Sequence, residues 1–177
     1  MNRDSLKQIM IDQKEIYLNN PLIPRHYYLE ENVNYCFVGI RRTGKSYMMY
    51  QQIKQLEANG IPLSQIVYVN FEDERLLEMT AADLNLILEI GLEISRTDVG
   101  GRFVIMNIYP YSFSEYLIAN HMKKNYLDVI STKDKADVQN QYNQYVTYGA
   151  FPELTEINNK RVFLNSIYQT VYLGDII

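Results

Sequence analysis

The stretch Phe37–Tyr47, FVGIRRTGKSY, decides the fold class of this chain. An apolar run that starts near Asn34 leads into glycine, two arginines, a second glycine, lysine and serine. Residues Gly39–Ser46 satisfy the pattern G-x-x-x-x-G-K-[ST] in full, with a predicted strand before them and a predicted helix after them. A chance glycine turn before a helix is the alternative, and the fitting context on both sides favours a P-loop.

Each residue type in this loop has a part in holding phosphate groups. The glycines, Gly39 and Gly44, let the backbone fold around phosphates and turn its N–H groups inward, with the backbone of Thr43 between them. Lys45 would reach the β- and γ-phosphates, and the Ser46 hydroxyl would ligate Mg²⁺. The helix that begins near Lys45 would direct its N-terminus at the anion. No guanine-reading N-K-x-D motif occurs in the chain, so the sequence favours ATP over GTP.

Hydrophobic periodicity and turn residues predict helices and strands in alternation along the chain. The predicted helices are 4–18, 45–58, 80–90, a segment that begins near Ser112 or Ser114, 136–147 and 159–173. The predicted strands are 34–39, 66–71 and 102–110. A polar linker, STKDKAD at 131–137, and a turn, YGAFPE at 148–153, separate the later helices. This order indicates an α/β core followed by a helical C-terminal part.

Composition narrows the class of protein further. The chain has 177 residues, of which 47% are hydrophobic, enough for one domain with a core or for one domain and a fragment of another. The net charge of −4 gives no global basic field for nucleic acid. The single cysteine, Cys36, excludes an internal disulfide, and we expect its side chain to be buried. With no apolar run of about 20 residues and no signal-peptide core, we expect a soluble cytoplasmic protein.

Three further segments, in this order, carry a family resemblance: IVYVNFEDERL, GGRFVIMNIYPYSFSEYL and YGAFPE. With the P-loop, they make the chain resemble prokaryotic AAA+-type P-loop ATPases that have an uncharacterised C-terminal domain. The resemblance implies a parallel sheet of order 5-1-4-3-2 flanked by helices, ATP with Mg²⁺ as cofactor, and ATP hydrolysis for an unknown client. It divides the chain into an N-terminal helix and lead-in at 1–30, a P-loop core at 31–117 and an incomplete helical C-terminal region at 118–177.

The sequence departs from that family after Ile90. Family members carry a Walker B strand with an acidic pair, then a sensor strand, before the segment EISRTDVGGRF. Here Ile90 is followed at once by Gly91-Leu92-Glu93. Without these two strands the sheet would have uncovered edges and faces. Either residues are omitted from the sequence or the protein is a shortened form, and the abrupt jump between family-like flanks favours omission.

Two other groups of charged residues are candidates for roles in hydrolysis. By resemblance, Arg102 would be an arginine finger that reaches the γ-phosphate of a neighbouring subunit, which implies a homo-oligomer; the alternative is a surface arginine. The acidic run Glu72-Asp73-Glu74 would serve as a substitute Walker B, although a solvated strand end is the favoured interpretation. Arg41 and Arg42 either add positive potential at the phosphates or are solvated loop residues, and the second is favoured.

Three functions remain open at this point. The first is a Mg²⁺-dependent ATPase, in which Lys45 acts in catalysis. The second is a nucleotide-binding switch or scaffold that does not hydrolyse, because it lacks the acidic strand. The third is a nucleic-acid-associated motor or defence ATPase, against which the acidic composition argues. His26 and His121 are too far apart in sequence to suggest a metal site.

Overall fold

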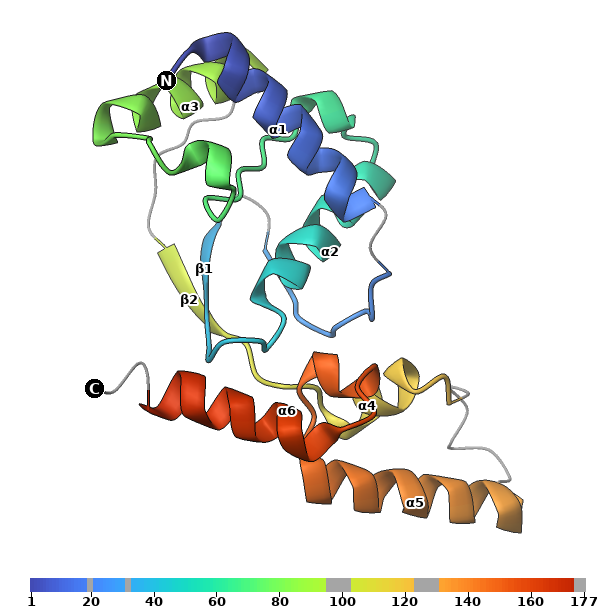
Figure 1. Ribbon diagram of the computed structural model, residues 1–177. Coiled ribbons are helices and arrows are strands. Elements are labelled where there is room, and N and C mark those ends of the chain that lie inside the picture. The colour runs from blue at the N-terminus through green and yellow to red at the C-terminus, as the bar shows by residue number, and fades with distance from the viewer. Residues whose placement is uncertain (19–20, 31–32, 95–102, 123–130, 174–177) are drawn as a thin grey trace. The chain divides into compact units, whose positions relative to one another are not determined.

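The computed structural model describes residues 1–18, 21–30, 33–94, 103–122 and 131–173 (Figure 1). The chain divides into two compact units. The first unit consists of Met1–Leu22 and Met49–Gly100, and the second consists of Ile23–Met48 and Gly101–Ile177. The expected ranges for a P-loop core and a C-terminal region stay a prediction.

The first unit contains helices α1 (Arg3–Leu18) and α3 (Ala81–Ile94), together with most of α2 (Lys45–Ala58). The buried residues of α1 recur at helical spacing, and they form one apolar cluster with residues from the η2 turn (Glu74–Leu76) and α3. This cluster consists of Leu6, Ile9, Met10, Leu76 and Ile90. A second cluster joins α2 to the segment that follows the η1 turn (Leu63–Gln65), and it consists of Tyr50, Ile53, Ile66 and Tyr68.

The prediction of a strand at 66–71 is wrong. In the described part of the chain, residues 66–70 have no regular secondary structure and pair with no strand. Ile66 and Tyr68 are buried against α2, so the apolar run packs by its side chains alone. A strand needs a partner for its backbone N–H and C=O groups, and a β-branched, aromatic composition does not supply one.

The second unit contains a two-stranded parallel sheet (Figure 1). Strand β1 (Asn34–Val38) pairs with β2 (Phe103–Asn107) in a register that runs from Asn34 opposite Phe103 to Val38 opposite Asn107. Both strands were predicted from the sequence. Their direct parallel pairing is compatible with an α/β P-loop-like fold, in which the last strand lies beside the P-loop strand.

This sheet is uncovered over much of its surface. Cys36, Val38 and Ile105 are exposed, as is Phe103 at 72%. The expectation of a buried Cys36 is therefore wrong. In a two-stranded sheet each strand has a neighbouring strand on one edge only, and the described residues place no third strand beside β1. The uncovered surface agrees with a sheet from which central strands are missing.

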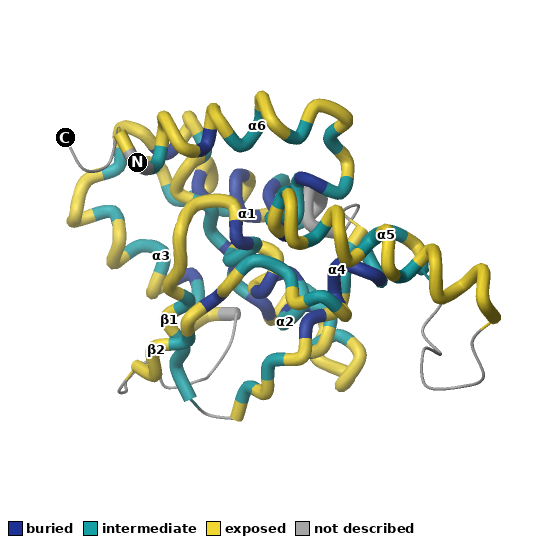
Figure 2. The backbone as a smooth tube through the Cα atoms, turned by 90° about the horizontal axis from the view of Figure 1, so that it is seen from below, coloured by how far each residue is buried: buried dark blue, intermediate teal, exposed yellow. Residues whose placement is uncertain are grey.

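Two helices of the second unit begin at capping boxes. Ser112 caps α4 (Phe113–Ala119), with its side chain bound by the backbone of Glu115 and its backbone bound by the Glu115 carboxylate. Ser131 and Asp134 cap α5 (Thr132–Tyr148) in the same way. The expected polar linker at 131–137 is thus the first part of a helix, because its serine and aspartate have capping-box spacing. Figure 2 shows α5 exposed along most of its length.

Aromatic side chains join α4 to α5. The ring of Phe113 makes edge contacts with Tyr142 and Tyr145, and the ring of Tyr116 makes an edge contact with Tyr145. After α5 the chain turns at Gly149, forms the short η3 helix (Pro152–Thr155) and enters α6 (Lys160–Ile167). A π-helical turn, η4 (Tyr168–Leu173), replaces the last part of the helix that was predicted through residue 173.

Candidate functional site

The predicted P-loop, residues 39–46, lies in the second unit between β1 and the first residues of α2. Gly39 lies at the end of β1, where the chain that leaves β2 passes very close: the Ile108 N–H donates to the Val38 carbonyl at 2.6 Å. A Cβ atom at Gly39 would lie 2.3 Å from the Ile108 carbonyl oxygen, so no other residue fits without movement of the backbone. The first glycine of the motif is therefore required by the way the two strands end.

The loop turns through two residues with left-handed backbone conformation. Arg42 has φ of 67° and Gly44 has φ of 89°, with Thr43 between them. Such alternation is typical of the concave backbone turns that hold anions, because it directs successive N–H groups to one side. Helix α2 begins at once afterwards, and the Met48 N–H donates to the Gly44 carbonyl as part of its first turn.

The side chains of Thr43 and Lys45 bind backbone carbonyl groups of the loop itself. Thr43 is fully buried, and its hydroxyl donates to the Ile40 carbonyl at 3.0 Å. The Lys45 ammonium lies over the loop and donates to the carbonyls of Gly39 at 2.9 Å and Ile40 at 2.8 Å. Ser46 is exposed in the first turn of α2, which contains no acidic residue. The positive end of this helix, the ammonium and the hydroxyl therefore surround one surface of the loop.

A buried arginine lies behind this loop. Arg25 is 6% exposed, and its Nη1 donates to the Thr43 carbonyl at 3.0 Å. Its Nη2 donates to the carbonyls of Tyr109 at 2.8 Å and Pro110 at 3.3 Å, where the chain leaves β2. The guanidinium carbon lies over the rings of Tyr27 and Tyr111, 5.3 and 5.4 Å from their centroids. One side chain thus connects the P-loop to the end of the neighbouring strand.

Glu115 balances the charge of Arg25. It is 5% exposed, and its carboxylate accepts from Arg25 Nε at 3.2 Å and from Nη2 at 3.4 Å. Burial by itself would raise the pKa of Glu115, but hydrogen bonds from Arg25 and Ser112 outweigh it and hold that pKa below the usual range. Removing either member of such a buried pair leaves an uncompensated charge and costs about 3–5 kcal/mol.

The turn that follows α5 also packs against the P-loop. Arg42 forms an ion pair with Glu153 of η3, and its guanidinium lies 5.4 Å from the ring centroid of Phe163 in α6. A Cβ atom at Gly44 would lie 3.7 Å from Cγ of Pro152. The favoured interpretation of Arg42 as a solvated residue is therefore incomplete, because its side chain is only half exposed and is held by two partners.

The acidic run of the first unit has a structural role. Asp73 caps the η2 turn and accepts from Arg75 and Gln13, and Arg75 also donates to Asp12. Hydrogen bonds from Arg75 and Gln13 hold the pKa of Asp73 well below its usual range. Among the residues that the structure describes, no group of three His, Cys, Asp or Glu side chains is arranged to bind a metal. Arg102, the expected arginine finger, lies outside those residues.

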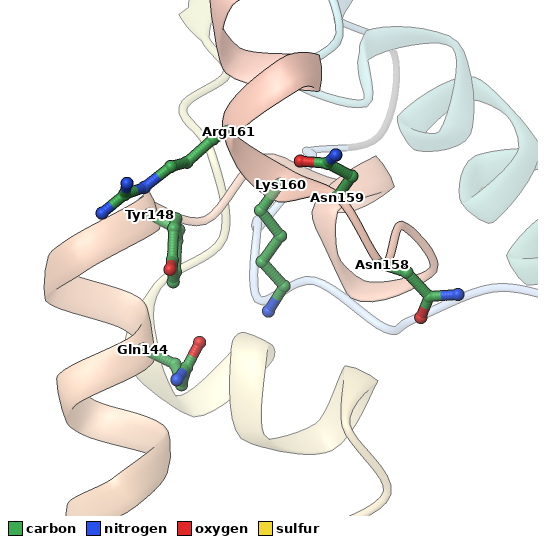
Figure 3. A pocket seen from close by; sticks show the side chains of 6 residues that line it. All are labelled: Gln144, Tyr148, Asn158, Asn159, Lys160 and Arg161. Atoms are coloured by element: carbon green, nitrogen blue, oxygen red, sulfur yellow. The ribbon is translucent and has the colours of Figure 1, made fainter.

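A polar pocket of about 220 Å³ lies elsewhere in the second unit, where α5 ends and α6 begins (Figure 3). In Figure 3 the side chains of Gln144 and Tyr148 come from α5, and the Lys160 side chain extends toward them from the start of α6. The Lys160 ammonium lies 5.7 Å from the centroid of the Tyr148 ring. The lining includes no residue of the P-loop, so this pocket is separate from the candidate phosphate site.

Sequence reasoning found only the part of the site that is local in the chain. It predicted Gly39, Thr43, Gly44, Lys45 and Ser46, and the structure places them together in one loop. It missed Arg25, Glu115 and Glu153. The capping-box spacing of Ser112 and Glu115 was a usable signal for a fixed carboxylate, but nothing in the segment PLIPRHYY marks Arg25 as the residue that binds the P-loop.

Comparison with known proteins concerns the part of the chain that contains the P-loop. Residues 32–99 match the family described as AAA domain. The match supports an AAA-type P-loop family. The matched range contains the whole P-loop together with α2 and α3, and the sheet and its flanking helices are compatible with that fold.

Two curated relatives are similar over most of this chain. An uncharacterized protein of Methanocaldococcus jannaschii is 26% identical over 222 residues, which cover 97% of this chain and 48% of the relative. An uncharacterized protein of Haemophilus influenzae is 24% identical over 215 residues, which cover 90% of this chain and 52% of the relative. The chain spans about half the length of the curated relatives it matches. No solved structure matches it.

These alignments are longer than the chain itself. The first extends over 222 residues, although the whole chain has only 177. The archaeal relative therefore has roughly 50 residues in the aligned region without a counterpart here, about the length of two strands with a helix and loops. The bacterial relative also has a longer aligned region, at 215 residues. This size agrees with the two strands that the family resemblance leads us to expect after Ile90 and that this sequence lacks.

Among the described residues, no helix is both long enough and apolar enough to cross a membrane.

Proposed function

We propose that this chain binds ATP together with Mg²⁺ through the loop Gly39–Ser46. The observation that carries the proposal is the geometry of this loop. The Ile108 carbonyl leaves no room for a side chain at Gly39, and the left-handed residues at 42 and 44 curve the backbone. The Lys45 ammonium binds the Gly39 carbonyl within this loop. Lys45 would bind the phosphate oxygens, and the exposed Ser46 hydroxyl would hold the metal. Bound Mg²⁺ would neutralise charge on the phosphates.

The test is ATP binding by Lys45→Ala, measured by titration calorimetry with and without Mg²⁺. A charge-assisted hydrogen bond contributes about 1.5–3 kcal/mol, so we expect the affinity to fall by about tenfold or more. Lys133→Ala is the matched control, because Lys133 is an exposed lysine on α5. Equal affinity of Lys45→Ala and the control for Mg·ATP would reject the site.

We further propose that the protein hydrolyses ATP if it contains a segment like the roughly 50 residues that the archaeal relative has in the aligned region and this sequence lacks. Hydrolysis needs one carboxylate to orient water and another to steady the metal. In the resembled family both come from that segment. Arg102 would then act between subunits of a homo-oligomer, so activity would rise with protein concentration and fall in Arg102→Ala.

The second candidate is a nucleotide-binding module that does not hydrolyse. The observation in its favour is that the described residues place no acidic strand beside β1. The intact mass of the purified protein separates the two candidates. A mass several kilodaltons above 20.8 kDa supports the ATPase, and a mass of 20.8 kDa supports the binding module.

A further inference from the structure

Arg25 binds the P-loop in addition to the carboxylate that neutralises its charge. Its partner Glu115 already neutralises it, yet Nη1 also donates to the carbonyl of Thr43 at 3.0 Å. Hydrogen bonds to the carbonyls that follow β2 hold the guanidinium, and the rings of Tyr27 and Tyr111 lie against it. The donor that faces the P-loop is therefore held in one orientation.

The contact with Thr43 determines how one peptide unit of the loop is oriented. A trans peptide is planar, and its C=O and N–H bonds point in opposite directions. The chain contains no cis peptide among its described residues. Because the Thr43 carbonyl points toward Arg25, the N–H of Gly44 points away from Arg25. A rotated Thr43–Gly44 peptide would instead present a carbonyl oxygen to a bound phosphate, and the two oxygens would repel each other.

Glycine at position 44 makes this rotation easy. Gly44 has φ of 89°, and glycine occupies left-handed and right-handed conformations about equally well. A Cβ atom there would only meet Cγ of Pro152 at 3.7 Å and Nη1 of Arg25 at 3.8 Å, so the packing around the residue leaves room. The orientation of the peptide thus depends on what its carbonyl binds rather than on steric hindrance.

We propose that Arg25 is a positioning residue of the phosphate site: by binding the Thr43 carbonyl it holds the Gly44 N–H in the orientation that donates to a phosphate group. The inference rests on the proposed function, since it names what keeps that same loop ready for a di- or triphosphate. Arg25 itself lies behind the loop and binds no phosphate. It also ties the loop to the end of β2 and to α4 through Glu115.

The test uses a label that reports on this peptide alone. Thr43–Gly44 is the one Thr-Gly sequence in the chain, so protein labelled with ¹³C-carbonyl threonine and ¹⁵N-glycine gives a single correlation peak. We would titrate the full chain with tripolyphosphate and Mg²⁺, which carries the phosphates without the base. In the wild type we expect this peak to move as the Gly44 N–H donates to phosphate, in parallel with binding measured by calorimetry.

The decisive variant is Arg25→Met. We expect its affinity for Mg·tripolyphosphate to fall by about tenfold or more, with a smaller shift of the Thr43–Gly44 peak at saturation. Arg25→Lys keeps a cation and an N–H donor for the Thr43 carbonyl, so it should retain an intermediate affinity. If Arg25→Met does not fold, the comparison of Arg25→Lys with the wild type takes its place.

Leu117→Ala controls for lost stability. Leu117 is an apolar side chain of α4 that is 4% exposed. Truncating it leaves a cavity that destabilises the protein without removing a charge or a hydrogen bond. We expect it to bind with nearly wild-type affinity. Equal loss in Leu117→Ala, or unchanged affinity and peak shift in a folded Arg25 variant, would overturn the role of Arg25. A wild type whose peak does not move and which binds neither tripolyphosphate nor ATP would instead overturn the proposed function.

Discussion

Gly39 lies where β1 ends beside the chain that leaves β2. A Cβ atom there would be 2.3 Å from the Ile108 carbonyl oxygen and 3.1 Å from the Thr43 hydroxyl. The first neighbour is a backbone atom that is held by the pairing of the two strands, so it cannot move aside alone. At this residue the requirement of the fold and the requirement of the phosphate motif coincide.

We therefore expect Gly39→Ala to destabilise the protein by about 1–3 kcal/mol, the usual cost of overpacking. Denaturant unfolding, followed by circular dichroism, measures the change. The matched control is Gly91→Ala in α3, where a Cβ atom would meet only Cγ2 of Val67 at 3.7 Å. Because alanine favours helix over glycine, we expect that variant to gain about 0.5–1 kcal/mol. A Gly39→Ala protein as stable as the wild type would contradict the close approach seen here.

The residues of the site divide into those that a motif can predict and those that it cannot. Gly39, Gly44 and Lys45 are predictable because they are neighbours in the chain and their spacing has one physical use. Arg25 is not predictable, because an arginine among prolines has no periodicity or spacing that indicates burial. Its role comes from contacts with residues 18 and 90 positions away in sequence.

At the scale of elements, local signals predicted helices better than strands. The capping pair Thr80 and Asp83 marked the start of α3, and in the structure the Asp83 carboxylate accepts from both the N–H and the hydroxyl of Thr80. At α5 the polar composition of residues 131–137 led to the prediction of a linker, although Ser131 and Asp134 form a capping box there. Residues 66–71 failed as a strand because pairing depends on a neighbour that no local sequence specifies.

The short η3 helix and α6 meet the P-loop at Arg42. The carboxylate of Glu153 pairs with Arg42 and adds negative potential beside a loop that would receive phosphates. We expect Glu153→Gln to bind Mg·ATP up to about threefold more tightly, a small effect because the pair is half exposed and screened by water. Titration at low ionic strength measures it.

Glu156→Gln is the matched control for this prediction. It makes the same change of charge three residues further on, at an exposed position. We expect its affinity for Mg·ATP to stay at the wild-type value. Weaker binding by Glu153→Gln than by the wild type would show that the ion pair supports the loop instead of competing with phosphate for Arg42.

At the scale of the whole molecule, the sequence predicted an incomplete sheet, because it lacks two strands that the resembled family has. The P-loop strand has β2 on one edge, and the described residues provide no strand for the other. Apolar side chains remain exposed on β2, and α3 exposes Leu84, Leu88 and Leu92 at helical spacing. The relatives have roughly 50 residues more in the aligned region, which is enough to supply the missing strands.

These observations lead to a prediction about turnover. Two described carboxylates of the second unit that lie close to the P-loop, those of Glu115 and Glu153, are each paired with an arginine. A carboxylate that is already paired with an arginine is poorly suited to orient water or steady Mg²⁺, two tasks that phosphoryl transfer requires. Protein with an intact mass of 20.8 kDa should therefore bind Mg·ATP through Lys45 yet release phosphate no faster than Lys45→Ala, whereas a longer protein with the segment of the relatives should hydrolyse it. If phosphate release by the 20.8 kDa protein depended on Lys45, the carboxylates needed for hydrolysis would already be present in this chain.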